Sequence, residues 1–236
     1  VTVLRGFTTF DPTRSRYEEV LRAQGRRVAE DWAKETTFSA GSTFRQTADT
    51  DAHDKAIVDH INTLVGPDDE LWILGDIGFR TSLTHLKNCL RALNCKHLHG
   101  VIGNHDDWWL EDRPALNLFE SLEPHDTVEI EGLGTVNLSH YPYREDLAYS
   151  WPDDVAKFSG KALPFDGRKL LYGHTHQLSP DGARPEALNV GLDAWDLMPV
   201  SETQVVEWFR NHDVDSPANG TSKADDSVPS LDMPSF

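Results

Sequence analysis

The sequence predicts an α/β fold in which two mixed β-sheets pack face to face and helices cover the outside. Two observations favour this class. In the first half of the chain short apolar segments alternate with segments of helical periodicity, whereas in the second half apolar segments follow one another. The chain also has 236 residues, of which 38% are hydrophobic, so it can bury a substantial core.

Three segments are predicted to be helical. Residues 15–35 carry apolar side chains at helical spacing, and Gly25 is expected to weaken this helix. Residues 52–65 place their aliphatic side chains on one face, as in an amphipathic helix, and residues 81–93 repeat that pattern. The polar residues 36–50 lack any period and are predicted to be a loop insertion.

Short apolar segments mark the predicted strands. In chain order these are ELWILGD (70–76), KHLHGVIGNHD (96–106), two strands around EGLG (126–142), KLLYGHTH (169–176), ALNVGLDAW (187–195) and TQVVEWF (203–209). After Arg210 the chain becomes rich in Ser, Asp and Pro, with few large apolar residues. We therefore expect a single domain over 1–210 and a disordered acidic tail over 211–236.

Charge and composition restrict the classes of function. The net charge of −17 argues against generic nucleic-acid binding, which requires a basic surface. A nucleotide or a nucleic-acid end stays possible as substrate, because a bound cation can reverse the local field. The cysteines, Cys89 and Cys95, suggest reduced thiols rather than a disulfide scaffold. No apolar run approaches the ~20 residues of a membrane span, so a cytoplasmic protein is expected.

Potential metal ligands stand at the ends of four predicted strands. Asp76 follows the first, Asn104 the second and His140 a later one, while His174 and His176 follow KLLYG. Residues i and i+2 of an extended chain point to the same side, so the last two imidazoles can converge on one object. Each residue alone has a structural explanation, such as a turn or strand end. Their joint occurrence behind apolar strands favours a metal site.

The motifs LGD, GNHD, a single His and GHTH, in this order, resemble the calcineurin-like metallophosphoesterase family over about residues 66–209. The segment LNVGLDAWDLMPVS is similar to the one that follows the last motif in small members of that family. The resemblance implies an αββα sandwich and a centre of two divalent metal ions, with Mn, Fe, Zn and Ni all compatible. It also implies hydrolysis of a phosphomonoester or phosphodiester by a metal-bridging hydroxide.

The resemblance also assigns roles to the metal ligands. Asp76 would bridge the two ions. Asn104, His140 and His174 would complete the second site, and His176 would reach the first.

Two further residues receive catalytic roles from the resemblance. His105 would stabilise the transferring phosphoryl group and protonate the leaving oxygen. Asp106 would hold the His105 imidazole in a productive orientation.

The chain departs from the family at its first motif, Asp-x-His. Asp51-Ala-His53 has the right residue types but follows polar residues and precedes a helix, so Thr50 or Asp51 also suits a helix N-cap. Alternatively, VTVLRGF at Val1 is similar to the segment that directly follows Asp-x-His. We favour the second account, in which the motif lies upstream of Val1.

The sequence thus predicts a phosphoesterase with a small molecule, a nucleotide or a nucleic-acid end as its phosphate-ester substrate. The alternative is a catalytically impaired metallophosphoesterase-like protein that binds a metal or a partner. The incomplete first motif favours this alternative. The intact GNHD motif argues against it, because a binding scaffold needs no general acid.

Overall fold

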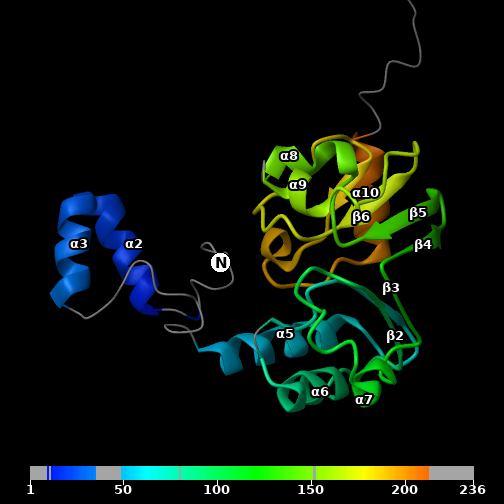
Figure 1. Cartoon of the computed structure of the whole chain (residues 1–236), viewed down its shortest axis with the longest axis horizontal. Helices are drawn as coiled ribbons and strands as arrows, with labels where there is room; N and C mark the ends of the chain where they lie inside the picture. The colour runs from blue at the N-terminus through cyan, green and yellow to red at the C-terminus, as the bar shows by residue number, and fades with distance from the viewer. Residues whose placement is uncertain (1–9, 11, 36–48, 80, 151–152, 213–236) are drawn as a thin grey trace, which may run out of the picture.

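The protein is a mixed α/β structure with two β-sheets flanked by helices, as the sequence predicts (Figure 1). The computed structural model describes residues 10, 12–35, 49–79, 81–150 and 153–212. The first half of the chain contains α2 (Pro12–Gln24), α3 (Arg26–Glu35), α5 (Thr50–Leu64), β1 (Glu70–Leu74), α6 (Leu83–Arg91), β2 (His97–Val101), α7 (Arg113–Leu116) and β3 (Ser121–Glu123).

The rest of the described chain contains four strands and, apart from α10, only short helices. Its elements are β4 (His125–Ile130), β5 (Gly134–Ser139), η1 (Arg144–Asp146), α8 (Leu147–Ser150), α9 (Asp154–Phe158), β6 (Lys169–Tyr172), β7 (Ala187–Asn189), η2 (Leu192–Trp195) and α10 (Glu202–His212). The predicted helix over 52–65 and the predicted strands that end before Asp76, Asn104, His140 and His174 are confirmed.

The strands form two sheets with different pairing. One sheet has the order β1-β2-β3, and both of its pairs are parallel. The other has the order β4-β5-β6-β7, in which β4 and β5 are antiparallel and the remaining pairs are parallel. The prediction of mixed sheets is therefore correct for the second sheet, whereas the described strands of the first sheet are all parallel.

A shared hydrophobic core joins the two sheets. Trp72 and Leu74 of β1 pack against a buried cluster that includes Leu138 of β5, Leu171 of β6 and Leu188 of β7. Neighbouring residues on each strand point to opposite faces, so the alternate residues of β1 lie on the other side of its sheet. There Leu71 and Ile73 join the core under α5, α6 and α7. This packing fixes the two sheets, and hence their strand ends, relative to each other.

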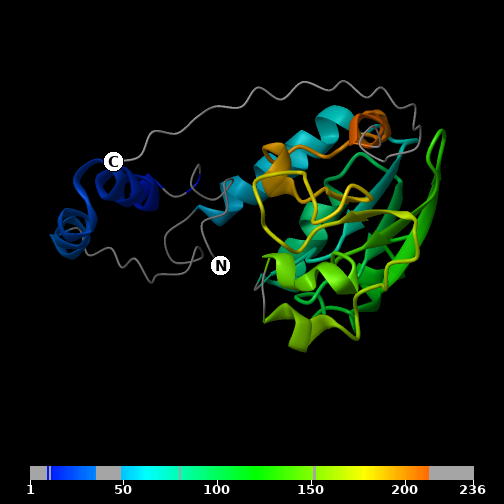
Figure 2. The same ribbon diagram turned by 90° about the horizontal axis from the view of Figure 1, so that it is seen from above.

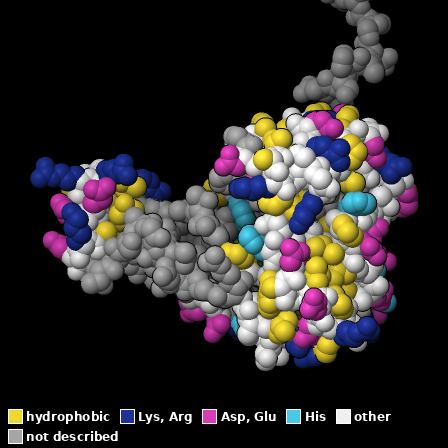
Figure 3. Space-filling model, in the orientation of Figure 1, with side chains coloured by type: hydrophobic (Ala, Val, Ile, Leu, Met, Phe, Trp, Pro, Cys, Tyr) yellow, Lys and Arg dark blue, Asp and Glu magenta, His cyan; other side chains and the backbone are white. Residues whose placement is uncertain are grey.

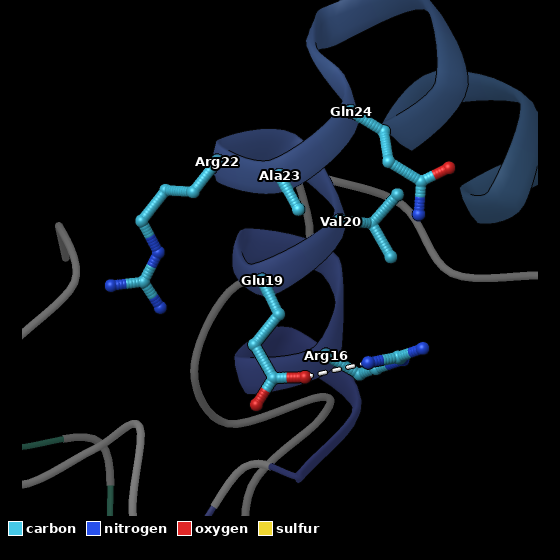
Figure 4. A pocket seen from close by; sticks show the side chains of 6 residues that line it. All are labelled: Arg16, Glu19, Val20, Arg22, Ala23 and Gln24. Carbon is cyan, nitrogen blue, oxygen red and sulfur yellow. Dashed lines mark hydrogen bonds and ion pairs between the residues drawn. The ribbon is translucent and has the colours of Figure 1, made fainter.

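Residues 15–35 form two helices rather than one. Gly25 adopts φ +85°, a left-handed conformation that glycine reaches without steric cost, and it ends α2. Helices α2 and α3 pack on each other, away from the two-sheet body (Figures 1 and 2), with the rings of Tyr17 and Trp32 6.3 Å apart. A surface hollow lies on α2 (Figure 4), lined by Arg16, Glu19, Val20, Arg22, Ala23 and Gln24.

The segment TQVVEWF is helical, so its prediction as a strand was wrong. Ser201 and Gln204 form a capping box: the Ser201 hydroxyl accepts from the backbone N–H of Gln204, and the Gln204 side chain accepts from the Ser201 backbone N–H. Val205, Val206, Trp208 and Phe209 then face the inter-sheet core. The β-branched and aromatic residues are typical of a strand, but the capping box and the burial of one face stabilise a helix here.

The predicted boundaries of the tail and the loop insertion also change. Helix α10 continues through Asn211 to His212, whose ring stacks on Trp208 with centroids 3.9 Å apart. The rest of the predicted tail, 213–236, lies outside the described residues, as do 36–48 of the predicted loop. Within the part of the chain that the structure describes, no helix combines the length and the apolar character needed to cross a membrane.

We predict that Phe209→Ala lowers the free energy of unfolding by about 3–5 kcal/mol, because the ring is fully buried and its removal leaves a cavity in the inter-sheet core. Glu207→Ala, at an exposed position of the same helix, is the control and should change stability by less than about 0.5 kcal/mol. Urea unfolding followed by circular dichroism measures both. Equal effects of the two substitutions would contradict the packing of α10.

Candidate metal centre

The side chains that follow four strands meet where the two sheets adjoin. Asp76 follows β1 and Asn104 follows β2 in the first sheet, while His140 follows β5 and His174 follows β6 in the second. Within each sheet these strands are parallel neighbours, so their carboxyl ends reach the same edge. The face drawn in Figure 3 exposes histidine side chains (cyan) between the upper and lower parts of the body.

One nitrogen lies at the centre of this group. His140 Nε2 is 3.1 Å from Asn104 Oδ1, 3.2 Å from His174 Nδ1 and 3.5 Å from Asp76 Oδ1. His140 is almost completely buried, and His174 and Asp76 are largely so. The structure therefore brings together four of the five predicted metal ligands.

The partners of the two imidazoles fix their protonation. His140 Nδ1 lies 2.8 Å from the carbonyl oxygen of Leu74, which can only accept, so Nδ1 carries the proton and Nε2 presents a lone pair. His174 Nε2 lies 2.8 Å from Asp154 Oδ2, and this contact likewise leaves a lone pair on His174 Nδ1. The two lone pairs and the oxygens of Asn104 and Asp76 are all electron-rich atoms. The other three atoms lie within 3.5 Å of His140 Nε2, and a cation among them would offset their mutual repulsion.

Burial keeps both imidazoles neutral. It lowers the pKa of His140 to about 4, below the ordinary value of 6.5. Burial and then the neighbouring His140 lower the pKa of His174 to about 4 as well. At neutral pH both rings are therefore in the form that binds metals.

Two glycines allow the close approach of the loops. A Cβ atom on Gly75 would lie 2.4 Å from His140 Nδ1, and one on Gly103 would lie 2.3 Å from Asp76 Oδ1. Either side chain would occupy space that the candidate ligands need. The glycines of LGD and GNHD are thus required by the geometry of the centre.

The backbone is strained at three of the predicted ligands. Asp76, His174 and His176 have φ of 52°, 65° and 51°, in the left-handed region that residues with a side chain seldom adopt. Such strain is common where the surrounding structure must hold a functional side chain in one direction.

Asp106 has a different role from the predicted one. Its carboxylate is fully buried and accepts backbone N–H groups from Asp76 at 2.9 Å, Ile77 at 2.8 Å and Gly103 at 2.8 Å, together with the indole N–H of Trp109 at 3.0 Å. Both carboxylate oxygens are thereby engaged. Asp106 holds the two ligand-bearing loops together, and the hypothesis that it orients the His105 imidazole is replaced.

His105 lies at the open side of the group. The residue is exposed, its backbone N–H donates to Asp76 Oδ1 at 2.9 Å, and its ring packs on Phe79 with centroids 4.4 Å apart. The side chain is therefore exposed to solvent, while its backbone is tied to Asp76.

His176, the fifth predicted ligand, is more exposed and has a partner that sequence reasoning missed. Its Nδ1 lies 3.0 Å from Asp193 Oδ2, in the segment after β7. Asp154, the partner of His174, was missed too. No local pattern marks either carboxylate, because Asp154 and Asp193 are 20 and 17 residues away from the histidines they contact.

Asp51 and His53, the alternative first motif, lie on helix α5 rather than at a strand end. Asp49 is the N-cap and accepts from the Ala52 backbone N–H at 2.9 Å, so the cap lies just before the predicted Thr50 or Asp51. His53 is buried, with Nδ1 3.0 Å from Asp54 Oδ1.

Comparisons with known proteins give relatives but no activity. No family model matches the chain. The chain is 33% identical over 169 residues to the Gene 66 protein of Mycobacterium phage D29, covering 64% of this chain and 81% of the relative. It is 30% identical over 175 residues to the Gene 66 protein of Mycobacterium phage L5, covering 62% and 76%.

One solved structure is also similar, that of the protein of unknown function AQ665 from Aquifex aeolicus. It matches with a TM-score of 0.47 and 24% identity, covering 65% of this chain and 83% of that one. The chain is more similar in sequence to the two phage proteins than to this structure, and it covers most of the length of both. The chain belongs to the family of the mycobacteriophage Gene 66 proteins.

Proposed function

We propose that the protein is a metal-dependent phosphoesterase, a hydrolase acting on a phosphomonoester or phosphodiester, with the αββα sandwich of the calcineurin-like metallophosphoesterases. The observation that carries the proposal is that Asn104, His174 and Asp76 each place a potential ligand atom within 3.5 Å of His140 Nε2. The order of the motifs that bear these residues, and the presence of two sheets flanked by helices, support it further.

The chemistry of the donor set fits a divalent transition-metal ion. Two neutral imidazole nitrogens, an amide oxygen and a carboxylate oxygen form the mixed N/O set that Mn, Fe, Zn and Ni accept. The backbone carbonyl of Leu74 and the carboxylate of Asp154 orient the two rings, as is usual for metal-binding histidines. Asp76 and His176, with Asp193 beside it, are the residues available to a second ion.

The roles of the residues follow from this arrangement. A bound divalent cation supplies a hydroxide at neutral pH and positive charge for the phosphoryl oxygens. His105 protonates the leaving oxygen and stabilises the phosphoryl group from the exposed side, where Phe79 supports its ring. Asp106 holds the loops that carry Asp76 and Asn104 in fixed positions relative to each other.

A second candidate, a metal-binding protein without turnover, is favoured by the donor count. Among the described residues, Asp76 and His176, with Asp193 beside it, offer a second ion fewer protein ligands than the four of a structural site. Metal content and hydrolysis measured on the same samples separate the two candidates: bound metal without turnover would support this second one.

We predict that Asp154→Asn weakens metal binding by about 10–100-fold, because the His174 ring loses the partner that orients it and fixes its tautomer. His174→Ala should remove binding at this site. Asp153→Asn is the matched control, since Asp153 is exposed and its side chain makes no capping bond. Calorimetric titration of chelator-treated protein with Mn²⁺ measures the affinities. Equal affinities of the Asp153 and Asp154 variants would count against the centre.

We predict that His105→Ala retains the metal but lowers the rate of hydrolysis by about 10²–10⁴-fold, as expected for the loss of a general acid. His125→Ala, at an exposed position of β4, should leave the rate unchanged. Hydrolysis of bis-p-nitrophenyl phosphate and p-nitrophenyl phosphate measures the rates, and elemental analysis measures the metal. Loss of metal in the His105 variant would show that the role is misassigned.

We predict that the metal-free protein loses stability as the pH falls from about 6.5 to about 4. The pKa of both His140 and His174 is about 4 in the folded chain, against an ordinary 6.5. Between these values the unfolded chain binds more protons, so acid favours unfolding, by about 1.4 kcal/mol for each unit of pKa difference.

Urea unfolding at several pH values measures this effect. His174→Gln should reduce the pH dependence in this window and leave the contribution of His140, whereas His125→Gln should keep it in full. A wild-type protein whose stability does not change between pH 6.5 and 4.5 would contradict the buried, neutral state of the two rings.

A further inference from the structure

A second group of metal-ligating side chains lies outside the candidate metal centre, between helices α5 and α6. It consists of Asp54 on α5 and of His85 and Cys89 on α6, whose ligand atoms all lie within 4.8 Å of one another. Asp54 Oδ2 is 2.8 Å from His85 Nε2, and His85 Nε2 is 3.5 Å from Cys89 Sγ. All three residues are half-buried.

The helix geometry explains why these residues meet. His85 and Cys89 are four residues apart on α6 and therefore lie on one face. Leu86 and Leu90 of the same helix pack with Ile61 of α5 in the core beneath the first sheet. The contact between the helices is thus fixed by buried side chains, independently of the three polar ones.

Further hydrogen bonds pin the other end of the helix pair. The Asn62 side chain on α5 donates to the carbonyl of Ala92 and accepts from the backbone N–H of Asn94, both just after α6. Beyond the polar group the two helices are therefore held together by Ile61 and Asn62, which makes the spacing of the group a property of the fold.

The carboxylate of Asp54 is held in one orientation. Its Oδ1 lies 3.0 Å from Nδ1 of the buried His53, whose ring packs edge-on against Phe10. Its Oδ2 is thereby directed at His85. One oxygen held by a buried imidazole and the other aimed into a group of donors is the arrangement of an oriented metal ligand.

The spacing suits a tetrahedral ion. Metal–ligand distances of about 2.0–2.3 Å for zinc place neighbouring ligand atoms roughly 3.3–3.8 Å apart. The separation of 3.5 Å lies in this range, the 2.8 Å between Asp54 and His85 would lengthen slightly around an ion, and all three atoms lie within 4.8 Å of one another. The combination of thiol, imidazole and carboxylate selects zinc-like ions over Mg²⁺ or Ca²⁺, which prefer oxygen alone.

We propose that Asp54, His85 and Cys89 form a separate binding site for a zinc-class divalent ion that ties α5 to α6, with His53 orienting the carboxylate. Three protein ligands leave a fourth position for water. This site does not depend on the proposed phosphoesterase activity.

The proposed ion would lie next to the loop that carries Asp76. Helix α6 follows the loop that carries Asp76, and a Cβ atom on Gly78 in that loop would lie 3.2 Å from Leu86 Cδ1 of α6. The loop therefore rests on the helix that the ion would hold. An ion at Asp54, His85 and Cys89 would therefore restrict the motion of the loop that carries Asp76 in the candidate metal centre.

Cobalt distinguishes this site from the candidate metal centre. A thiolate bound to Co²⁺ gives a charge-transfer absorption in the near ultraviolet, and the other centre contains no sulfur ligand. Chelator-treated full-length protein titrated with Co²⁺ under reducing conditions should develop this band. Cys89→Ser and His85→Gln should abolish it. Cys95→Ser is the matched control and should keep it, because Cys95 contacts the carbonyls of Asp69 and His97 instead.

The outcomes separate the site from its alternatives. A wild-type protein without the band at saturating Co²⁺ would overturn the proposal and leave a metal-free hydrogen-bond network. A band that survives His85→Gln would show cobalt held by an isolated thiol, and one lost in Cys95→Ser would place it elsewhere. The far-ultraviolet circular dichroism of each variant checks that it is folded. Where the Cys89 or His85 variant is not folded, a band that is present in the wild type and kept in Cys95→Ser still assigns the ligand to Cys89.

Discussion

The buried carboxylate of Asp106 is the interaction on which the candidate metal centre depends. A fully buried charge is costly unless hydrogen bonds replace the water it loses. Here the backbone N–H groups of Asp76, Ile77 and Gly103, with the indole of Trp109, replace that water. These donors belong to the loops after β1 and β2 and to the turn after GNHD. Removing the carboxylate would leave several buried N–H groups without a partner, so both loops would move at once.

Hydrogen bonds of His140 connect the two sheets at their strand ends. His140, at the end of β5, donates through Nδ1 to the carbonyl of Leu74 at the end of β1, and its own carbonyl accepts from the Gly173 backbone N–H after β6. Gly75 leaves room for the imidazole between the sheets. Because the inter-sheet core also fixes the strands, the positions of the ligands are set by packing, and the hydrogen bonds then set the direction of each ring.

Local sequence signals predicted the strand ends well and the long-range partners poorly. Asp76, Asn104, His140 and His174 each follow a short apolar strand, and parallel neighbours bring such ends together, so their convergence could be inferred. The capping box before α10 is a local signal for a helix that the strand prediction for TQVVEWF did not use. Other features depend on contacts between distant segments, which one sequence does not reveal. These are Asp154, Asp193, the loop contacts of Asp106, and the group of Asp54, His85 and Cys89.

The arrangement of the centre is costly to the folded chain on its own. Left-handed backbone at Asp76, His174 and His176 costs on the order of 1–3 kcal/mol each, and electron-rich atoms face one another around His140 Nε2. The hydrogen bonds of Asp106 to the two loops and the hydrophobic core between the sheets stabilise the fold enough to offset both costs. A cation bound here, as proposed above, would find its ligands already oriented and would relieve their repulsion. Its binding free energy is not consumed in ordering the loops, which is how a preorganised site gains affinity.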